Sequence, residues 1–167
     1  MGKVLRRSAI LALFWSLFCS PVMAQNNGST TVCKQVSSLI AKHKNNKGVM
    51  SWSCDGGIGL QSVRLMLRKE FDRNFTDAIT NFAIIIYKDA STDNATKIVG
   101  DIARITSALQ EIDIRDKMKK GEEAHGYVRL TENGKTITDL LIVVEAPSPK
   151  LIYIGGEFDA AHAQIKR

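Results

Sequence analysis

The side chains best suited to chemistry in this chain are two cysteines, Cys33 and Cys54. A helix from Cys33 to Asn45 would rise about 18 Å, and a strand from Val49 to Cys54 would return about 17 Å. If the two elements pack antiparallel, Cys54 ends near Cys33. The spacing therefore predicts a structural disulfide, which would contribute about 3 kcal/mol in the chain-entropy model. Two unpaired thiols are the alternative. A redox-active cysteine pair is less expected, because the usual Cys-X-X-Cys motif is absent.

The three histidines, His43, His125 and His162, are far apart in the sequence. His43 falls on the apolar stripe of a helix that also carries Val36 and Leu39, which is typical of a buried histidine with a hydrogen-bond partner. No histidine has a neighbouring His, Cys or carboxylate at metal-ligand spacing. We therefore predict no metal site.

Other motifs indicate neither catalysis nor a cofactor. The loop Asp55-Gly-Gly-Ile-Gly lacks the Lys-Ser/Thr that ends a phosphate-binding loop. Its glycines are therefore interpreted as residues that allow the backbone to turn from a strand into a helix. No Gly-X-Ser-X-Gly nucleophile motif is present. Basic residues on the helix that begins at Leu60 alternate with Glu70 and Asp72, without an aromatic platform, which favours a solvated face over nucleic-acid binding.

The first 24 residues have the pattern of a cleaved signal peptide. Lys3, Arg6 and Arg7 precede the apolar run Ala9–Cys19, and small residues predict cleavage after Ala24. The run is shorter than the roughly 20 residues that span a bilayer, so we expect no stable membrane span after cleavage. Export would place the cysteines where disulfides persist.

A lipid-modified Cys19 is the alternative for this segment, and it would tether the protein to a membrane. Bulky Leu17 and Phe18 precede Cys19, where a lipoprotein signal requires small residues. The signal holds three of the 23 basic residues and none of the 17 acidic ones, so its removal lowers the net charge from +6 to +3. Composition therefore gives little reason to expect nucleic acid or an anionic membrane as the partner.

The remaining 143 residues are enough for one domain. Residues 25–31 are small and polar and predict a flexible leader, whose Ser and Thr residues can cap the helix that follows. Residues 32–167 form the predicted domain. Helices alternate with early strands, and three late strands over Ala124–Glu157 are joined by Asn133-Gly134 and a Pro-rich turn. We predict an α+β fold with a mostly antiparallel sheet, a C-terminal β-meander and helices packed mainly on one face.

Three stretches of this domain carry a resemblance. They are FAIIIYKD (82–89), GYVRLTENGKTITDLLIVV (126–144) and KLIYIGGEFD (150–159). With the signal peptide, they resemble a family of small exported proteins of Gram-negative bacteria known as domain-of-unknown-function family 4252, from about Lys47 onward. The resemblance implies export to the periplasm or outer envelope and a compact α+β domain, and it supplies no activity or site residues.

The leading hypothesis is a non-enzymatic exported domain that binds a protein or an envelope component through a sheet face or edge. Tyr127 and Arg129 share one face of their predicted strand with His125, while Val128 and Leu130 lie on the other. If helices cover the apolar face, Tyr127 and Arg129 are candidate binding residues, although an ordinary solvated face is the simpler interpretation. A small-ligand carrier or a hydrolase, with a pocket between helices and sheet, is the alternative.

Overall fold

In the part of the chain that the structure describes, six antiparallel strands form one sheet in the order β1-β2-β6-β5-β4-β3. The computed structural model describes residues 30–69, 71–114 and 121–160. Within these ranges the elements in chain order are α2 (Thr31–His43), β1 (Met50–Cys54), α3 (Gly57–Leu67), α4 (Arg73–Asp77), β2 (Ile79–Ile86), α5 (Thr92–Thr106), β3 (Gln110–Ile112), β4 (Glu123–Leu130), β5 (Thr136–Ala146) and β6 (Lys150–Asp159). The prediction of an α+β fold with a mostly antiparallel sheet is confirmed.

The late strands β4, β5 and β6 form the predicted meander. Gly134 has a φ of 67° in the β4–β5 turn, a conformation that glycine adopts without steric cost. The side-chain oxygen of Asn133 accepts hydrogen bonds from the backbone N–H of Lys135 and from the hydroxyl of Thr131. The Asn-Gly hairpin that the sequence indicates is therefore confirmed, and β6 continues the sheet by pairing with β2.

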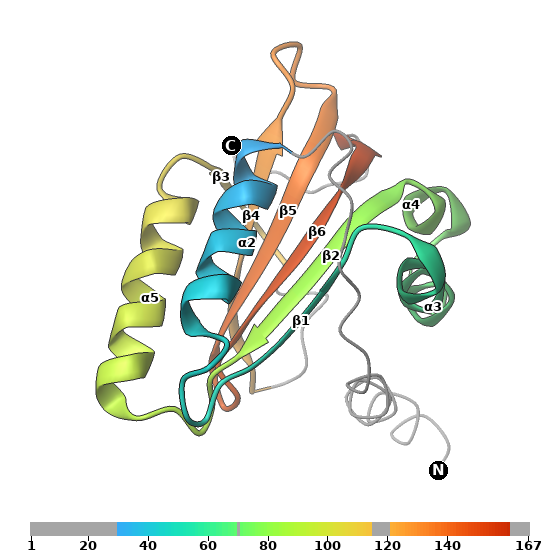
Figure 1. Cartoon of the computed structure of the whole chain (residues 1–167). Coiled ribbons are helices and arrows are strands. Elements are labelled where there is room, and N and C mark those ends of the chain that lie inside the picture. The colour runs from blue at the N-terminus through green and yellow to red at the C-terminus, as the bar shows by residue number, and fades with distance from the viewer. Residues whose placement is uncertain (1–29, 70, 115–120, 161–167) are drawn as a thin grey trace.

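The sheet is apolar on both faces, and each face has its own core. Along β2, Ala83 and Ile85 point into one cluster while Phe82 and Ile84 point into the other, because successive strand side chains alternate. The first cluster is completed by α2 and α5, and the second by α3. Figure 1 shows α2 and α5 side by side, whereas α3 and α4 lie apart from them, beside β1 and β2.

The prediction that the helices pack mainly on one face is therefore not confirmed. The sequence shows why α3 needs a face of its own: Leu60, Val63 and Leu67 lie along one side of that helix and are buried. Burying each such side chain contributes about 2 kcal/mol. The second face of the sheet carries Phe82 and Ile84, which supply the matching apolar surface.

Several predictions concern residues outside the described ranges. These are the signal peptide (1–24) and most of the leader (25–31). The alternation of Ile112, Ile114 and Met118 with polar residues also predicts a strand, and Asp159 as a cap predicts a short helix from Ala160; most of both elements lies outside the described ranges. Of that strand, β3 includes only its start, through Ile112. Thr30, at the end of the predicted leader, caps α2 as expected.

Candidate functional site

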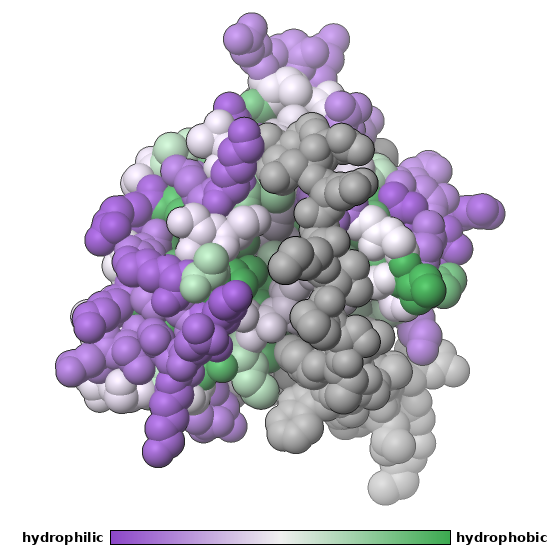
Figure 2. Space-filling view, in the orientation of Figure 1, coloured by the Kyte–Doolittle hydropathy of each residue, from purple (hydrophilic) through white to green (hydrophobic). Residues whose placement is uncertain are grey.

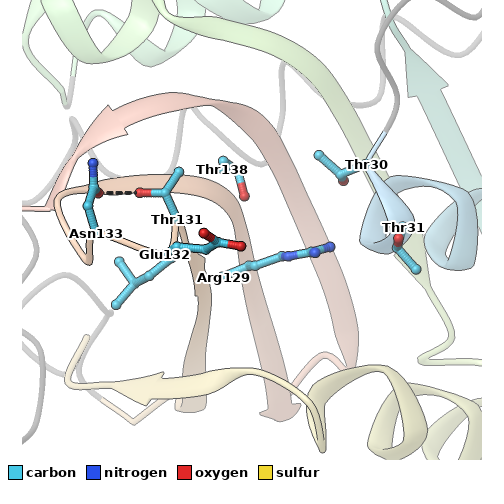
Figure 3. Close-up of a pocket in the computed structure, with 8 residues that line it drawn as sticks. Thr30, Thr31, Arg129, Thr131, Glu132, Asn133 and Thr138 are labelled. Atoms are coloured by element: carbon cyan, nitrogen blue, oxygen red, sulfur yellow. Dashed lines mark hydrogen bonds between the residues drawn. The ribbon is translucent and has the colours of Figure 1, made fainter.

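A polar groove of about 730 Å³ lies between the start of α2 and the β4–β5 hairpin (Figure 3). It brings together the first described residues, at the start of α2, and residues of the β4–β5 hairpin about 100 positions later. Seven of its eight lining residues carry a hydroxyl, amide, carboxylate or guanidinium group. The lining residues are Thr30, Thr31, Arg129, Leu130, Thr131, Glu132, Asn133 and Thr138.

A fully buried carboxylate, that of Asp139, adjoins this groove. Its Oδ1 accepts hydrogen bonds from the hydroxyl of Thr30 and from the phenol of Tyr153, the latter at 2.8 Å. Its Oδ2 accepts one from the hydroxyl of Thr138 at 2.9 Å. Three hydroxyl donors thus compensate the loss of water around this acid, which would otherwise cost several kcal/mol.

A β-bulge at Thr138 aims Asp139 toward α2. The register slips between Ile137 and Asp139 against β6, and between Arg129 and Leu130 against β4. Without the extra residue, Ile137 and Asp139 would share a face, because strand side chains repeat every second residue. With it, Ile137 enters the α3 cluster while Asp139 meets Thr30 on the α2 side.

Gly155 lets Tyr153 reach Asp139. Gly155 is the direct cross-strand partner of Asp139, and a Cβ added to it would lie 2.5 Å from the Tyr153 hydroxyl oxygen. The ring therefore lies over a residue that has no side chain. Burial raises the pKa of Tyr153, and the neighbouring Asp139 raises it further. The phenol therefore keeps its proton and acts as a donor.

Thr30 joins this network to the helix. Its Oγ1 accepts a hydrogen bond from the backbone N–H of Cys33 at 3.1 Å and donates its own hydrogen to Asp139. One hydroxyl thus caps α2 and fixes the helix start to the sheet. An N-cap of this kind is worth about 1 kcal/mol.

Arg129 is the cationic group of the groove. It is exposed, and it lies directly across from Asp139 in the sheet register. Its guanidinium extends toward Thr30 and Thr31 at the start of α2 (Figure 3). Within the described residues it makes no hydrogen bond or ion pair. A free guanidinium beside hydroxyls and a helix N-terminus suits a carboxylate or a phosphate.

Tyr127, the second predicted binding residue, lies on the same face but outside the groove. It is half-buried and packs against the cluster of α2 and α5. Burial raises the pKa of its phenol, and Glu111 and Glu145 raise it further. The face is therefore open only in part: α2 and α5 cover its apolar centre around Leu141 and Val143, whereas Arg129 is exposed.

The predicted Cys33–Cys54 disulfide is not formed. Both cysteines are free. Cys33 packs against the α2–α5 cluster, whereas Cys54 belongs to the α3 cluster on the opposite face of the sheet. Helix and strand lengths indicate how far along β1 Cys54 lies, but they do not indicate on which face of the sheet its side chain lies. Burial raises the pKa of the Cys54 thiol to about 12, and the charge of Asp55 also raises it.

His43 is buried, with 2% of its surface exposed, and joins α2 to α5. Its Nε2 lies 2.8 Å from Oδ2 of Asp101, and its Nδ1 lies 3.1 Å from Nδ2 of Asn46. Lys42 also donates to Asp101, so the pKa of Asp101 is held below its usual value, first by the His43 bond and then by Lys42. The prediction of a buried, hydrogen-bonded histidine is confirmed.

Sequence reasoning missed Asp101, although a signal was present. Asp101 lies on the same side of its helix as Ile98 and Ile105, where an acid is unexpected unless it has partners.

Among the described residues, no three His, Cys, Asp or Glu side chains gather closely enough to hold a metal ion. In the same ranges no helix has the length and apolar character that crossing a bilayer requires.

These features define an α+β domain with an all-antiparallel six-stranded sheet, two separate cores and a polar groove beside a buried acid. No family model, curated protein or solved structure matches the chain. The resemblance to domain-of-unknown-function family 4252 therefore stays a prediction.

Proposed function

We propose that this chain is an exported, non-enzymatic binding domain of the periplasm or outer envelope. Its partner is a protein or envelope component that presents an anionic group to the groove beside α2. The observation that carries the proposal is the exposed guanidinium of Arg129, which has no ion-pair partner among the described residues and extends along the groove toward Thr30 and Thr31.

The surroundings of Arg129 support a role in recognition. The buried network beneath it fixes the groove wall, because Asp139 binds Thr30, Tyr153 and Thr138. A rigid wall lowers the conformational entropy that binding must overcome. The same network leaves Asp139 enclosed by donors, so this acid supports the site and does not face the groove as a base.

A small-ligand carrier is the second candidate. The groove volume of about 730 Å³ falls within the range of small-molecule sites, about 300–1,000 Å³. Such sites are usually lined by apolar and aromatic side chains, whereas here Leu130 is the one apolar residue of the lining. A polar metabolite with a carboxylate or phosphate would fit this lining better than an apolar ligand.

The experiment is photocrosslinking in the native envelope. A photoreactive amino acid replaces Glu132, which is exposed and lines the groove, and in a matched control it replaces exposed Lys97 on α5. We expect a discrete adduct from position 132 that position 97 does not give.

The outcome also separates the two candidates. A macromolecular adduct specific to position 132 supports the binding domain. The small-ligand carrier is supported instead if neither position yields a macromolecular adduct and if polar anionic metabolites raise the melting temperature of the wild type but not of Arg129→Gln. Identical adducts from both positions would contradict a role for the groove.

A further inference from the structure

Strand β1 (Met50–Cys54) forms one edge of the sheet, and no strand among the described residues pairs with its outer side. Its five residues, MSWSC, contain no charged residue and no proline, and its register with β2 is regular throughout. Protein edges are usually protected against pairing by charges, prolines, bulges or short length. The opposite edge follows that rule, because β3 has three residues and includes Glu111.

The sequence of β1 is self-complementary around Trp52. If a second copy pairs antiparallel about a two-fold axis at Trp52, Ser51 meets Ser53 of the second copy and Met50 meets Cys54. Polar side chains then face polar ones on one side of the sheet. Apolar side chains face apolar ones on the other side, where Cys54 already joins the α3 cluster.

Among the described residues, Ile58 at the start of α3 is the most exposed large apolar residue, with 87% of its surface exposed. Its neighbour Gly59 packs on Trp52, since a Cβ at Gly59 would lie 3.5 Å from the indole ring. Figure 2 shows an apolar patch on the side of the molecule where α3 lies. A two-fold axis at Trp52 would bring the start of α3 from both copies to the same face, next to one another.

We propose that β1 is a homodimerisation edge, on which β1 of a second copy pairs antiparallel and continues the sheet through both protomers. The edge supplies backbone hydrogen bonds, and Trp52 and Ile58 supply the apolar contact. This proposal is independent of the groove, because β2 and β6 separate β1 from β5 and β4, the strands that border the groove.

The test is sedimentation equilibrium of the exported protein and three lysine variants. Ser53→Lys places a charge on an exposed position of the edge, and Ile58→Lys places one beside the axis. The matched control is Val99→Lys, since Val99 is 52% exposed on α5, away from β1. We expect a dimer whose Kd rises at least about tenfold in both edge variants and stays unchanged in the control.

Hydrogen exchange gives a second measurement. The β1 amides should gain protection as the wild-type concentration rises through the Kd, whereas those of β3 should not. A wild type that is monomeric up to about 1 mM overturns the proposal. So does a dimer that Ser53→Lys and Ile58→Lys leave intact, or a monomer whose β1 edge binds an extended peptide instead. If Ser53→Lys fails to fold, Ile58→Lys and hydrogen exchange still decide the question.

Discussion

Thr30 donates a hydrogen bond to Asp139, which lies 109 residues later in the chain. This contact joins the first residue of the described structure to the fourth residue of β5. It fixes α2 on the sheet and forms one wall of the groove that holds Arg129. The stability of the fold and the shape of the proposed site therefore depend on the same hydroxyl.

Thr30→Val should lower the free energy of unfolding by about 1–3 kcal/mol, because it removes both the helix cap and one donor to a buried acid. Thr30→Ser keeps the hydroxyl and serves as the matched control, with an expected loss below about 1 kcal/mol. Urea unfolding measures both variants. Equal stability of the two variants would show that the Thr30–Asp139 contact is not important for the fold.

Tyr153→Phe should cost about 1–2 kcal/mol, because the ring still fills the core while Asp139 loses one of its three donors. Tyr127→Phe is the control, since the Tyr127 phenol is half-buried and does not contact Asp139. The same urea titrations give the comparison. A Tyr153→Phe variant as stable as Tyr127→Phe would contradict the network.

Gly155→Ala should destabilise the fold by about 1–3 kcal/mol, because the new methyl group would overlap the Tyr153 hydroxyl and displace it from Asp139. Gly100→Ala is an unusually clear control. Gly100 lies within α5 with nothing within 4 Å of an added Cβ, so alanine should stabilise the helix by about 0.5–1 kcal/mol. The prediction is therefore opposite signs for two identical substitutions, measured by thermal unfolding. Loss of stability in both, or in neither, would refute it.

Asp101 should contribute to the acid sensitivity of the fold. Its pKa is lowered in the folded protein from an ordinary value of 3.8. Its contribution to the free energy of unfolding is therefore fully present when the pH is well above 3.8. It is lost as the pH falls through the folded pKa. The wild type should therefore lose stability below about pH 4 more steeply than Asp101→Asn. Urea unfolding from pH 7 to pH 2 checks this, and parallel curves would contradict it.

The two thiols should differ in reactivity. Cys54 is buried with its pKa raised to about 12, whereas Cys33 is half-exposed. Alkylation with iodoacetamide at pH 8, followed by mass spectrometry, should label Cys33 in the folded protein and Cys54 only after unfolding. Recovery of a Cys33–Cys54 disulfide would overturn the assignment of the two thiols to opposite faces.

Local patterns in the sequence are sufficient to predict much of this fold. Asn133-Gly134 identifies the hairpin, because both residues tolerate positive φ. Ile98, Ile102 and Ile105 identify the buried side of α5. These features depend on residues close in sequence, whose geometry is determined by helix or turn periodicity.

The site depends on contacts that no local pattern indicates. Regular alternation along TITDLLIVV places Asp139 on the same face as Ile137, and the bulge at Thr138 reverses this. Pairing of Asp139 with Thr30 is set by the tertiary packing of α2. The same limitation explains the disulfide error, since chain lengths specify where Cys54 lies along β1 but not which face it occupies. Arg129 was predicted as a binding residue, but its groove was not.

The proposed function requires that Arg129 contacts the anionic group of the partner, and its most direct measurement is the yield of the position-132 photoadduct in Arg129 variants. Arg129→Gln should reduce the yield at least about tenfold, and Arg129→Lys should keep part of it, since lysine retains the charge but not the planar fork. Arg104→Gln is the matched control, because Arg104 is an exposed arginine that pairs with Asp101 outside the groove. We expect full yield from that control. An adduct that forms equally well in Arg129→Gln and in Arg104→Gln would contradict the proposed function.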